Sequence, residues 1–224
     1  MQRKIITTAD GSKTIQIEDW NEQYHSVHGA VQEANHVYIK HGLLFFIEEY
    51  ASKYNSIAIL EIGFGTGLNA ILTLLSSEKL NLNINYFGVE AYPVSSDELQ
   101  HLNYSEILDI TDNSFQSIHN CDWESTHHIS KHFSLTKLKK LFNDINDVNC
   151  YDIIYFDAFG ARVQPELWTE ALFKKMYAAL KQNGVLVTYS SKGTVKRALK
   201  AVGFTIERLD GPPGKRHMLR AIKR

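Results

Sequence analysis

Three glycines at alternate positions follow an apolar run and precede a helical pattern between Ile59 and Asn69. The order of residues there is Ile-Leu-Glu-Ile-Gly-Phe-Gly-Thr-Gly-Leu-Asn. Glycine has no Cβ atom, so a backbone built from it can turn sharply and approach a ligand closely. A glycine-rich turn from a strand into a helix is typical of the first strand of a parallel sheet that binds a nucleotide-type cofactor. We therefore expect an α/β fold with its site at the carboxyl ends of the strands.

The spacing of Gly63, Gly65 and Gly67 narrows the cofactor. It is G-x-G-x-G, whereas dinucleotide-binding enzymes carry G-x-G-x-x-G. The shorter spacing after a strand favours the amino-acid end of S-adenosylmethionine over a pyrophosphate. A purely structural turn is the alternative.

Glu90 follows an apolar stretch at residues 84–89 and lies 23 residues after Gly67. An acidic residue about 20 residues beyond the glycines commonly accepts hydrogen bonds from ribose hydroxyls. Its charge would repel a 2′-phosphate, which argues against NADP. A solvated acid at the end of a strand is the alternative.

Asp157 follows a second apolar run, residues 151–156. Strand ends of an open α/β sheet meet at one edge, so Asp157 is expected near Gly63 and Glu90. Methyl transfer from a sulfonium needs an acceptor lone pair, so an amine acceptor must be neutral to attack. Asp157 suits the role of the group that orients the amine and collects its proton. A cap for the following loop is the alternative.

Strand and helix patterns alternate from residue 57 to the end of the chain. We predict strands at residues 57–63, 84–89, 132–138, 151–156, 184–189, 204–209 and 217–222. We predict five helices. The first begins at residue 68, the second spans 96–102, and the third follows the strand at 132–138 and ends at about 142. The fourth runs from 165 to about 182, and the fifth spans 194–201. This alternation implies a mostly parallel seven-stranded sheet with helices on both faces and an antiparallel terminal hairpin.

The first 54 residues have a different pattern. An Asp-Gly turn at residues 10–11 between two β-branched runs predicts a hairpin, and loop and helices follow. We expect residues 1–54 to pack over the mouth of the sheet and residues 55–224 to form the main domain.

Composition places the chain among ordinary globular proteins. It has neither a membrane-spanning apolar run nor a signal-peptide core, and its two cysteines suit a reducing, cytoplasmic setting.

The net charge of −1 hides a balance of +8 over residues 191–224. Such a basic segment indicates an anionic partner, with a solvated helix face and tail as the alternative. Histidines cluster near residues 25–41 and 119–132 without metal-ligand spacing, so we expect no metal site.

Several blocks together resemble the methyltransferase half of the bacterial tRNA wobble-uridine modification enzymes called MnmC, or MnmD when it stands alone. They are residues 24–30, 33 with 36–39, 59–69, 157–159 with 165–168, 189–197 and 214–219. The resemblance covers nearly the whole chain. It implies a Rossmann-like class I methyltransferase that N-methylates 5-aminomethyl-2-thiouridine at the tRNA wobble position. In MnmC an FAD-dependent oxidase domain follows, so we expect the oxidase here to be absent or a separate protein.

The resemblance also implies roles for individual residues. Asp157 would face the amine. The S-adenosylmethionine site would comprise Glu61, Gly63, Phe64, Gly65, Gly67, Leu68, Asn69 and Glu90. On the substrate side, Tyr24 and Glu33 would lie in the N-terminal wall of the site. Phe159, Trp168 or Tyr189 could stack on the target base, and a place in the hydrophobic core is the alternative for each. Contacts to RNA phosphates would come from Lys192, Arg197, Lys215 and Arg216.

Two features depart from this pattern. Lysines follow the third strand where many methyltransferases carry an acid near the adenine, and residues 160–162 are Gly-Ala-Arg where the family usually has proline. Other readings remain open: a small-molecule amine N-methyltransferase, an NAD-binding oxidoreductase and a non-catalytic RNA-binding protein.

Overall fold

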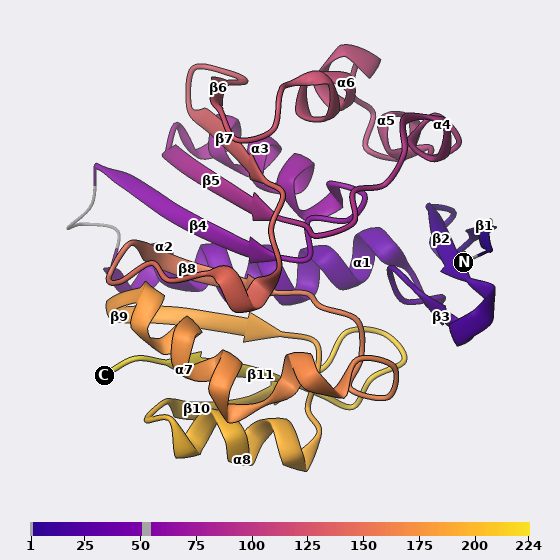
Figure 1. Cartoon of the computed structure of the whole chain (residues 1–224). Coiled ribbons are helices and arrows are strands. Elements are labelled where there is room, and N and C mark those ends of the chain that lie inside the picture. Colours follow the sequence, from indigo (N-terminus) through magenta and orange to yellow (C-terminus); the bar gives the residue numbers. More distant parts are fainter. Residues whose placement is uncertain (1, 51–54) are drawn as a thin grey trace.

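The computed structural model describes residues 2–50 and 55–224, which are built around an eight-stranded sheet (Figure 1). The strand order is β10-β11-β9-β8-β4-β5-β7-β6. The five central strands run parallel: β4 (Ser56–Ile62), β5 (Asn83–Val89), β7 (Phe133–Leu138), β8 (Tyr151–Phe156) and β9 (Leu180–Thr188). The predicted mostly parallel α/β architecture is confirmed.

The register of the central strands brings the predicted strand-end residues together. β4 lies between β5 and β8, and Ile62 at its end pairs with Val89 on one side and Phe156 on the other. Every residue of β8 is buried, as its apolar run predicts. The next residues along the three strands, Gly63, Glu90 and Asp157, therefore emerge side by side.

The two edges of the sheet are antiparallel. β11 (His217–Ile222) inserts between β10 (Thr205–Asp210) and β9, so the predicted terminal hairpin is confirmed. At the opposite edge β6 (Thr126–His128) pairs with β7 and makes the sheet eight-stranded rather than seven-stranded. A three-residue strand is too short to leave a period in the sequence.

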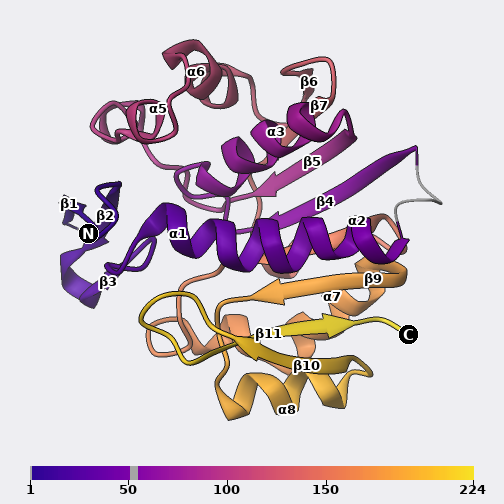
Figure 2. The same cartoon turned by 180° about the vertical axis from the view of Figure 1, so that it is seen from behind.

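Helices cover both faces of the sheet. α7 (Glu170–Ala179) and α8 (Gly193–Ala201) lie on the face nearer the viewer in Figure 1, over one hydrophobic core. The other face carries α3 (Leu68–Leu80) and a long N-terminal helix (Figure 2). That helix runs continuously through three segments: α1 (Ala30–Ala34), the π-helical η2 (Asn35–Leu44) and α2 (Phe45–Tyr50).

Gly42 lets the long helix lie close against the sheet. A Cβ atom at this position would be 3.0 Å from the Val187 side chain and 3.1 Å from the Tyr155 ring. The close packing holds η2 over β8 and β9 and fixes the direction of its other side chains.

The N-terminal segment lies at the carboxyl ends of the parallel strands (Figures 1 and 2). β1 (Arg3–Thr7) pairs antiparallel with β2 (Lys13–Ile17), as the Asp-Gly turn predicts. The short 3-10 helix η1 (Glu18–Trp20) and strand β3 (Glu22–Gln23) follow. The predicted boundary at residue 54 falls outside the described residues.

Several predicted helices differ in the structure. The helix predicted from 165 to 182 is a 3-10 turn, η5 (Pro165–Trp168), then α7, because Thr169 is extended and its hydroxyl caps α7, and β9 begins at Leu180. The helix predicted up to 142 is wrong: a 3-10 turn, η4 (Phe142–Asp144), stands there. The predicted helix at 96–102 shortens to α4 (Ser96–Leu99), which has a capping box between Ser95 and Glu98.

Two short helices, α5 (Tyr104–Ile107) and α6 (Asp112–Asn120), were not foreseen. Within the described residues, no helix combines the length and the apolar character needed to span a bilayer.

Candidate active site

The glycine loop is pinned between two strand ends. The backbone N–H groups of Gly63 and Phe64 both donate to the carbonyl oxygen of Val89, at 3.0 Å each. Gly63 has φ +91°, and a Cβ atom there would lie 2.8 Å from the carbonyl oxygen of Asp157. The first glycine therefore lets the loop pass directly over the strand that carries Asp157.

Glu90 closes the loop from the side of β5. Its carboxylate accepts hydrogen bonds from the N–H of Gly65 at 3.1 Å and of Tyr92 at 3.0 Å. Glu90 also lines a cavity that lies between this loop and the N-terminal segment. Gly67 does not line that cavity. It has φ +73° at the start of α3, where a Cβ atom would lie 3.0 Å from the His119 ring.

A chain of hydrogen bonds links two carboxyl groups beneath the loop. Asn69 donates from Nδ2 to Glu61 Oε1 and to Asp157 Oδ2, at 2.8 Å in both cases. The Tyr86 hydroxyl donates to Glu61 Oε2 at 2.8 Å. Burial raises the pKa of Glu61 well above its usual value, and the nearby Asp157 raises it further.

Asp157 faces the cavity and receives a second hydrogen bond. The Tyr38 hydroxyl donates to Asp157 Oδ1 at 2.6 Å. Burial raises the pKa of Asp157 to about 6, and the charge of Glu33 acts in the same direction, whereas the two hydrogen bonds oppose the rise. A carboxyl group with this pKa can exchange a proton near neutral pH.

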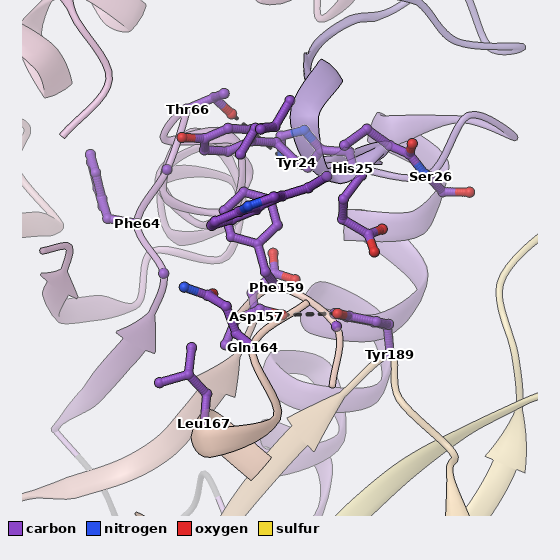
Figure 3. Close-up of a pocket in the computed structure, with 18 of the residues that line it drawn as sticks. Tyr24, His25, Ser26, Phe64, Thr66, Asp157, Phe159, Gln164, Leu167 and Tyr189 are labelled. Atoms are coloured by element: carbon purple, nitrogen blue, oxygen red, sulfur yellow. Dashed lines mark hydrogen bonds between the residues drawn. The ribbon is translucent and has the colours of Figure 1, made fainter. Parts of the chain in front are cut away.

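The cavity has a volume of about 920 Å³ and lies between the glycine loop and the N-terminal segment (Figure 3). Tyr24, His25 and Ser26 form the wall across from Asp157, Phe159 and Tyr189. The rings of Tyr24 and Phe159 meet edge to face, with centroids 4.9 Å apart.

Arg162 ties the loop after Asp157 to the N-terminal segment. Its Nη2 donates to the carbonyl oxygens of Trp20 and Asn21, at 2.8 and 2.9 Å, and pairs with Glu22 at 3.1 Å. The Gly-Ala-Arg sequence that departs from the family pattern thus supplies the contact that joins the two walls.

Glu33 and Lys215 meet inside the cavity. Lys215 Nζ forms an ion pair with Glu33 Oε1 and lies 3.9 Å from the centroid of the Tyr189 ring. Glu33 is thus in the predicted wall, whereas Lys215, expected on the RNA-facing surface, is turned inward. Lys192 is exposed at the cavity mouth, and Arg197 and Arg216 are exposed outside it.

Comparison with known proteins decides the family. The model of an S-adenosyl-L-methionine-dependent methyltransferase family matches residues 109–224, more than half of the chain. The chain belongs to this family of methyltransferases. The methyltransferase therefore uses S-adenosylmethionine, and the alternative of an NAD-binding oxidoreductase is wrong.

Relatives of the methyltransferase share most of its length. The tRNA 5-methylaminomethyl-2-thiouridine biosynthesis bifunctional protein MnmC of Burkholderia thailandensis is 28% identical over 89% of this chain, and that of Actinobacillus pleuropneumoniae is 27% identical over 90%. In both cases the match covers 32% of the relative, so the chain spans about a third of their length.

Solved structures agree on the fold. The crystal structure of MnmC2 from Aquifex aeolicus matches with a TM-score of 0.80 and 25% identity, over 100% of this chain and 70% of that one. Spermidine synthase from Thermotoga maritima matches with a TM-score of 0.57 and 12% identity, over 100% and 72%, and supports the fold alone.

The residues present fit S-adenosylmethionine. Gly63 and Gly65 put no side chain into the cavity and so leave room for a ligand beside the backbone. A Cβ atom at Gly65 would lie 3.0 Å from the Tyr24 ring and would fill part of that room. Asn69 Oδ1 is buried without a hydrogen-bond partner among the described residues and can accept from a ligand. Of the predicted cofactor residues, all but Gly67 line the cavity: Glu61, Gly63, Phe64, Gly65, Leu68, Asn69 and Glu90.

The region expected to hold the adenine contains no acid from the third strand. Leu141, Phe142 and Asn143 line the cavity, as do Ala91 and Tyr92, whereas the two preceding lysines do not. The adenine would thus meet apolar side chains and one amide.

Trp168 belongs to the core, 6% exposed, and its indole N–H donates to the carbonyl oxygen of Phe159.

His25 is a neutral part of the wall. It bonds to the Thr14 hydroxyl through Nδ1 at 2.8 Å, and burial lowers its pKa to about 4. Among the described residues, no group of three His, Cys, Asp or Glu side chains is arranged to hold a metal ion. Sequence reasoning missed Tyr38, whose place on the buried face of η2 has no signature in the sequence.

Proposed function

We propose that this methyltransferase methylates the exocyclic amine of 5-aminomethyl-2-thiouridine at the tRNA wobble position, giving 5-methylaminomethyl-2-thiouridine. A separate FAD-dependent oxidase, or another enzyme, would supply the aminomethyl group, and the reaction would take place in the cytoplasm.

The observation that carries this proposal is the cavity-facing Asp157. Its carboxyl group lies beside the glycine loop and has a pKa of about 6. A base of this strength suits an acceptor that arrives as an ammonium ion. The MnmC relatives, whose names state the biosynthesis of this nucleoside, support the same acceptor.

The cofactor side of the cavity would bind and orient the methyl donor. S-adenosylmethionine supplies a methyl group already activated on a sulfonium. Gly63 and Gly65 would hold its amino-acid end, and Glu90 would accept hydrogen bonds from its ribose. Asp157 would take the proton of the acceptor ammonium, and Tyr38 and Asn69 would stabilise and orient the carboxylate.

The acceptor side would receive a base that has left the anticodon stack. A target base must leave the stack to reach a buried site, and the half-buried Phe159, which lines the cavity beside Tyr24, would offer it an aromatic ring. Tyr24 and Glu33 belong to this wall, which the Arg162 contacts attach to the loop after Asp157.

Lys192, Arg197 and Arg216 would contact phosphates, which set affinity without reading sequence. We expect Arg197→Gln/Arg216→Gln to weaken tRNA binding several-fold at low salt and to lower the slope of log affinity against log salt by ~1.4, since each phosphate contact on a single strand contributes ~0.7. Fluorescence anisotropy with labelled tRNA at several salt concentrations measures both effects.

The matched control is Lys131→Gln/Lys174→Gln, which removes two exposed charges away from the cavity mouth. It should leave the salt slope unchanged, and both double variants should bind S-adenosylhomocysteine like the wild type. If the wild type does not bind tRNA, the remaining candidate is the small-molecule amine N-methyltransferase, whose cavity needs no basic surface.

A further inference from the structure

The ammonium group of Lys215 lies between a buried carboxylate and an aromatic ring. It comes from the loop between β10 and β11, and its Nζ pairs with Glu33 while lying 3.9 Å from the centre of the Tyr189 ring. A carboxylate and an aromatic face together are a strong combination for binding a cation. The group they hold here is an ammonium on a methylene carbon, which is also the chemistry of an aminomethyl substituent.

Glu33 is held in place by a backbone hydrogen bond. The residue is 6% exposed, and its Oε2 accepts a hydrogen bond from the Ser26 N–H at 2.8 Å. Oε1 is left to face the cation. A carboxylate this buried is costly without a positive partner. An ammonium group at this position, from the chain or from a ligand, is therefore favoured.

The same position is coupled to the proposed base. The charge of Glu33 raises the pKa of Asp157, and the charge of Lys215 lowers it. The Tyr189 hydroxyl donates to the carbonyl oxygen of Ala158 at 2.8 Å, directly after Asp157 (Figure 3). A cation between Glu33 and Tyr189 thus lies within electrostatic reach of the group that would take its proton.

We propose that Glu33 and Tyr189 form the subsite for the acceptor's ammonium group, and that Lys215 occupies this subsite until the acceptor arrives. The inference rests on the proposed function. Lys215 neighbours the exposed Arg216 on its loop, so a released Lys215 can turn toward the phosphates of bound RNA. The bound ammonium then loses a proton to Asp157: an N–H bond breaks, an O–H bond forms, and the electron pair of the N–H bond stays on nitrogen as the lone pair of the neutral amine.

The test compares two anticodon stem-loops that differ only in the amine. One carries 5-aminomethyl-2-thiouridine at the wobble position, and the other carries 2-thiouridine. Binding is measured by fluorescence anisotropy with saturating S-adenosylhomocysteine, so no turnover occurs. The readout is the dissociation constant of the 2-thiouridine stem-loop divided by that of the amine-bearing stem-loop. Contacts to phosphates contribute equally to both constants and cancel from this ratio.

For the wild type we expect tighter binding of the amine-bearing stem-loop. Lys215→Met should increase the ratio; if Lys215 fills the subsite about nine-tenths of the time, the increase is about tenfold, because apparent affinity scales with the competent fraction. Glu33→Gln should bring the ratio close to one. Lys174→Met, which removes an exposed lysine outside the cavity, should leave the ratio unchanged.

A ratio that Lys215→Met leaves at the wild-type value overturns the inference, and so does a Glu33→Gln variant that keeps full discrimination. Thermal unfolding and S-adenosylhomocysteine binding identify a misfolded variant. If Glu33→Gln does not fold, the Lys215→Met result alone decides the test. If the wild type with methyl donor does not methylate the amine-bearing stem-loop, the proposed function fails. If methylation proceeds but the ratio responds to neither variant, the inference alone fails.

Discussion

Replacing Asp157 with asparagine is expected to lower kcat for methyl transfer by about 10²- to 10⁴-fold, the usual contribution of a positioned general base. Asparagine keeps the size of the side chain, and it can still accept the hydrogen bond from Asn69 and donate to the Tyr38 oxygen. The change therefore removes the proton acceptor and leaves the packing intact. Single-turnover kinetics with a labelled methyl donor give the rate.

The pH profile separates a base from a structural group. Because the pKa of Asp157 is raised from 3.8 to about 6, the ionised form is present above that pH and lost as pH falls through it. The wild-type kcat should thus fall to about one-tenth of its plateau one pH unit below the pKa. Tyr38→Phe removes a hydrogen bond that lowers this pKa, so its profile should move to higher pH.

Binding of S-adenosylhomocysteine by calorimetry is the control for both variants, which should retain it. An Asp157→Asn enzyme that keeps more than half of the wild-type kcat contradicts the assignment of Asp157 as the base.

Replacing Gly63 with alanine is expected to weaken cofactor binding about tenfold or more and to lower the unfolding temperature. The residue has φ +91°, where a non-glycine residue costs about 1–3 kcal/mol. A Cβ atom there would also lie 2.8 Å from the carbonyl oxygen of Asp157, which is backbone and has little room to move. The loop would have to shift away from β8, and each 1.4 kcal/mol lost from binding is about tenfold in affinity.

Gly193→Ala is the matched control. Gly193 has no positive φ, and a Cβ atom there would meet only the end of the flexible Arg197 side chain, at 3.3 Å. It lies in α8, where alanine is favoured. Calorimetric titration with S-adenosylhomocysteine should show the loss for Gly63→Ala alone. Equal affinities for the two variants contradict the placing of the cofactor against Gly63.

The residues of this site that can be predicted from sequence are those marked by a short local pattern. Gly63, Glu90 and Asp157 each follow an apolar run, and parallel strands bring such ends to one edge. The register of β5, β4 and β8 is what makes three separate patterns one site. The helix prediction from 165 failed because Thr169 leaves the helical conformation while the apolar pattern continues past it.

The missed parts depend on residues far apart in the chain. Tyr38 lies 119 positions before Asp157, and Glu33 lies 182 positions before Lys215. Neither pairing leaves a local pattern, because each depends on how the long helix packs through Gly42 and where the β10–β11 loop folds back. The family resemblance assigned Lys215 to the RNA-facing surface, where three of the four predicted cations do lie.

Methylation of an amine on tRNA is the reaction that we propose for this cavity. Its most direct test is to incubate the protein and a labelled methyl donor with tRNA from cells that lack this enzyme, and then to analyse the nucleosides by mass. We expect 5-aminomethyl-2-thiouridine to be consumed and the label to appear in 5-methylaminomethyl-2-thiouridine. Label in any other nucleoside, or none in tRNA, would contradict the proposed reaction.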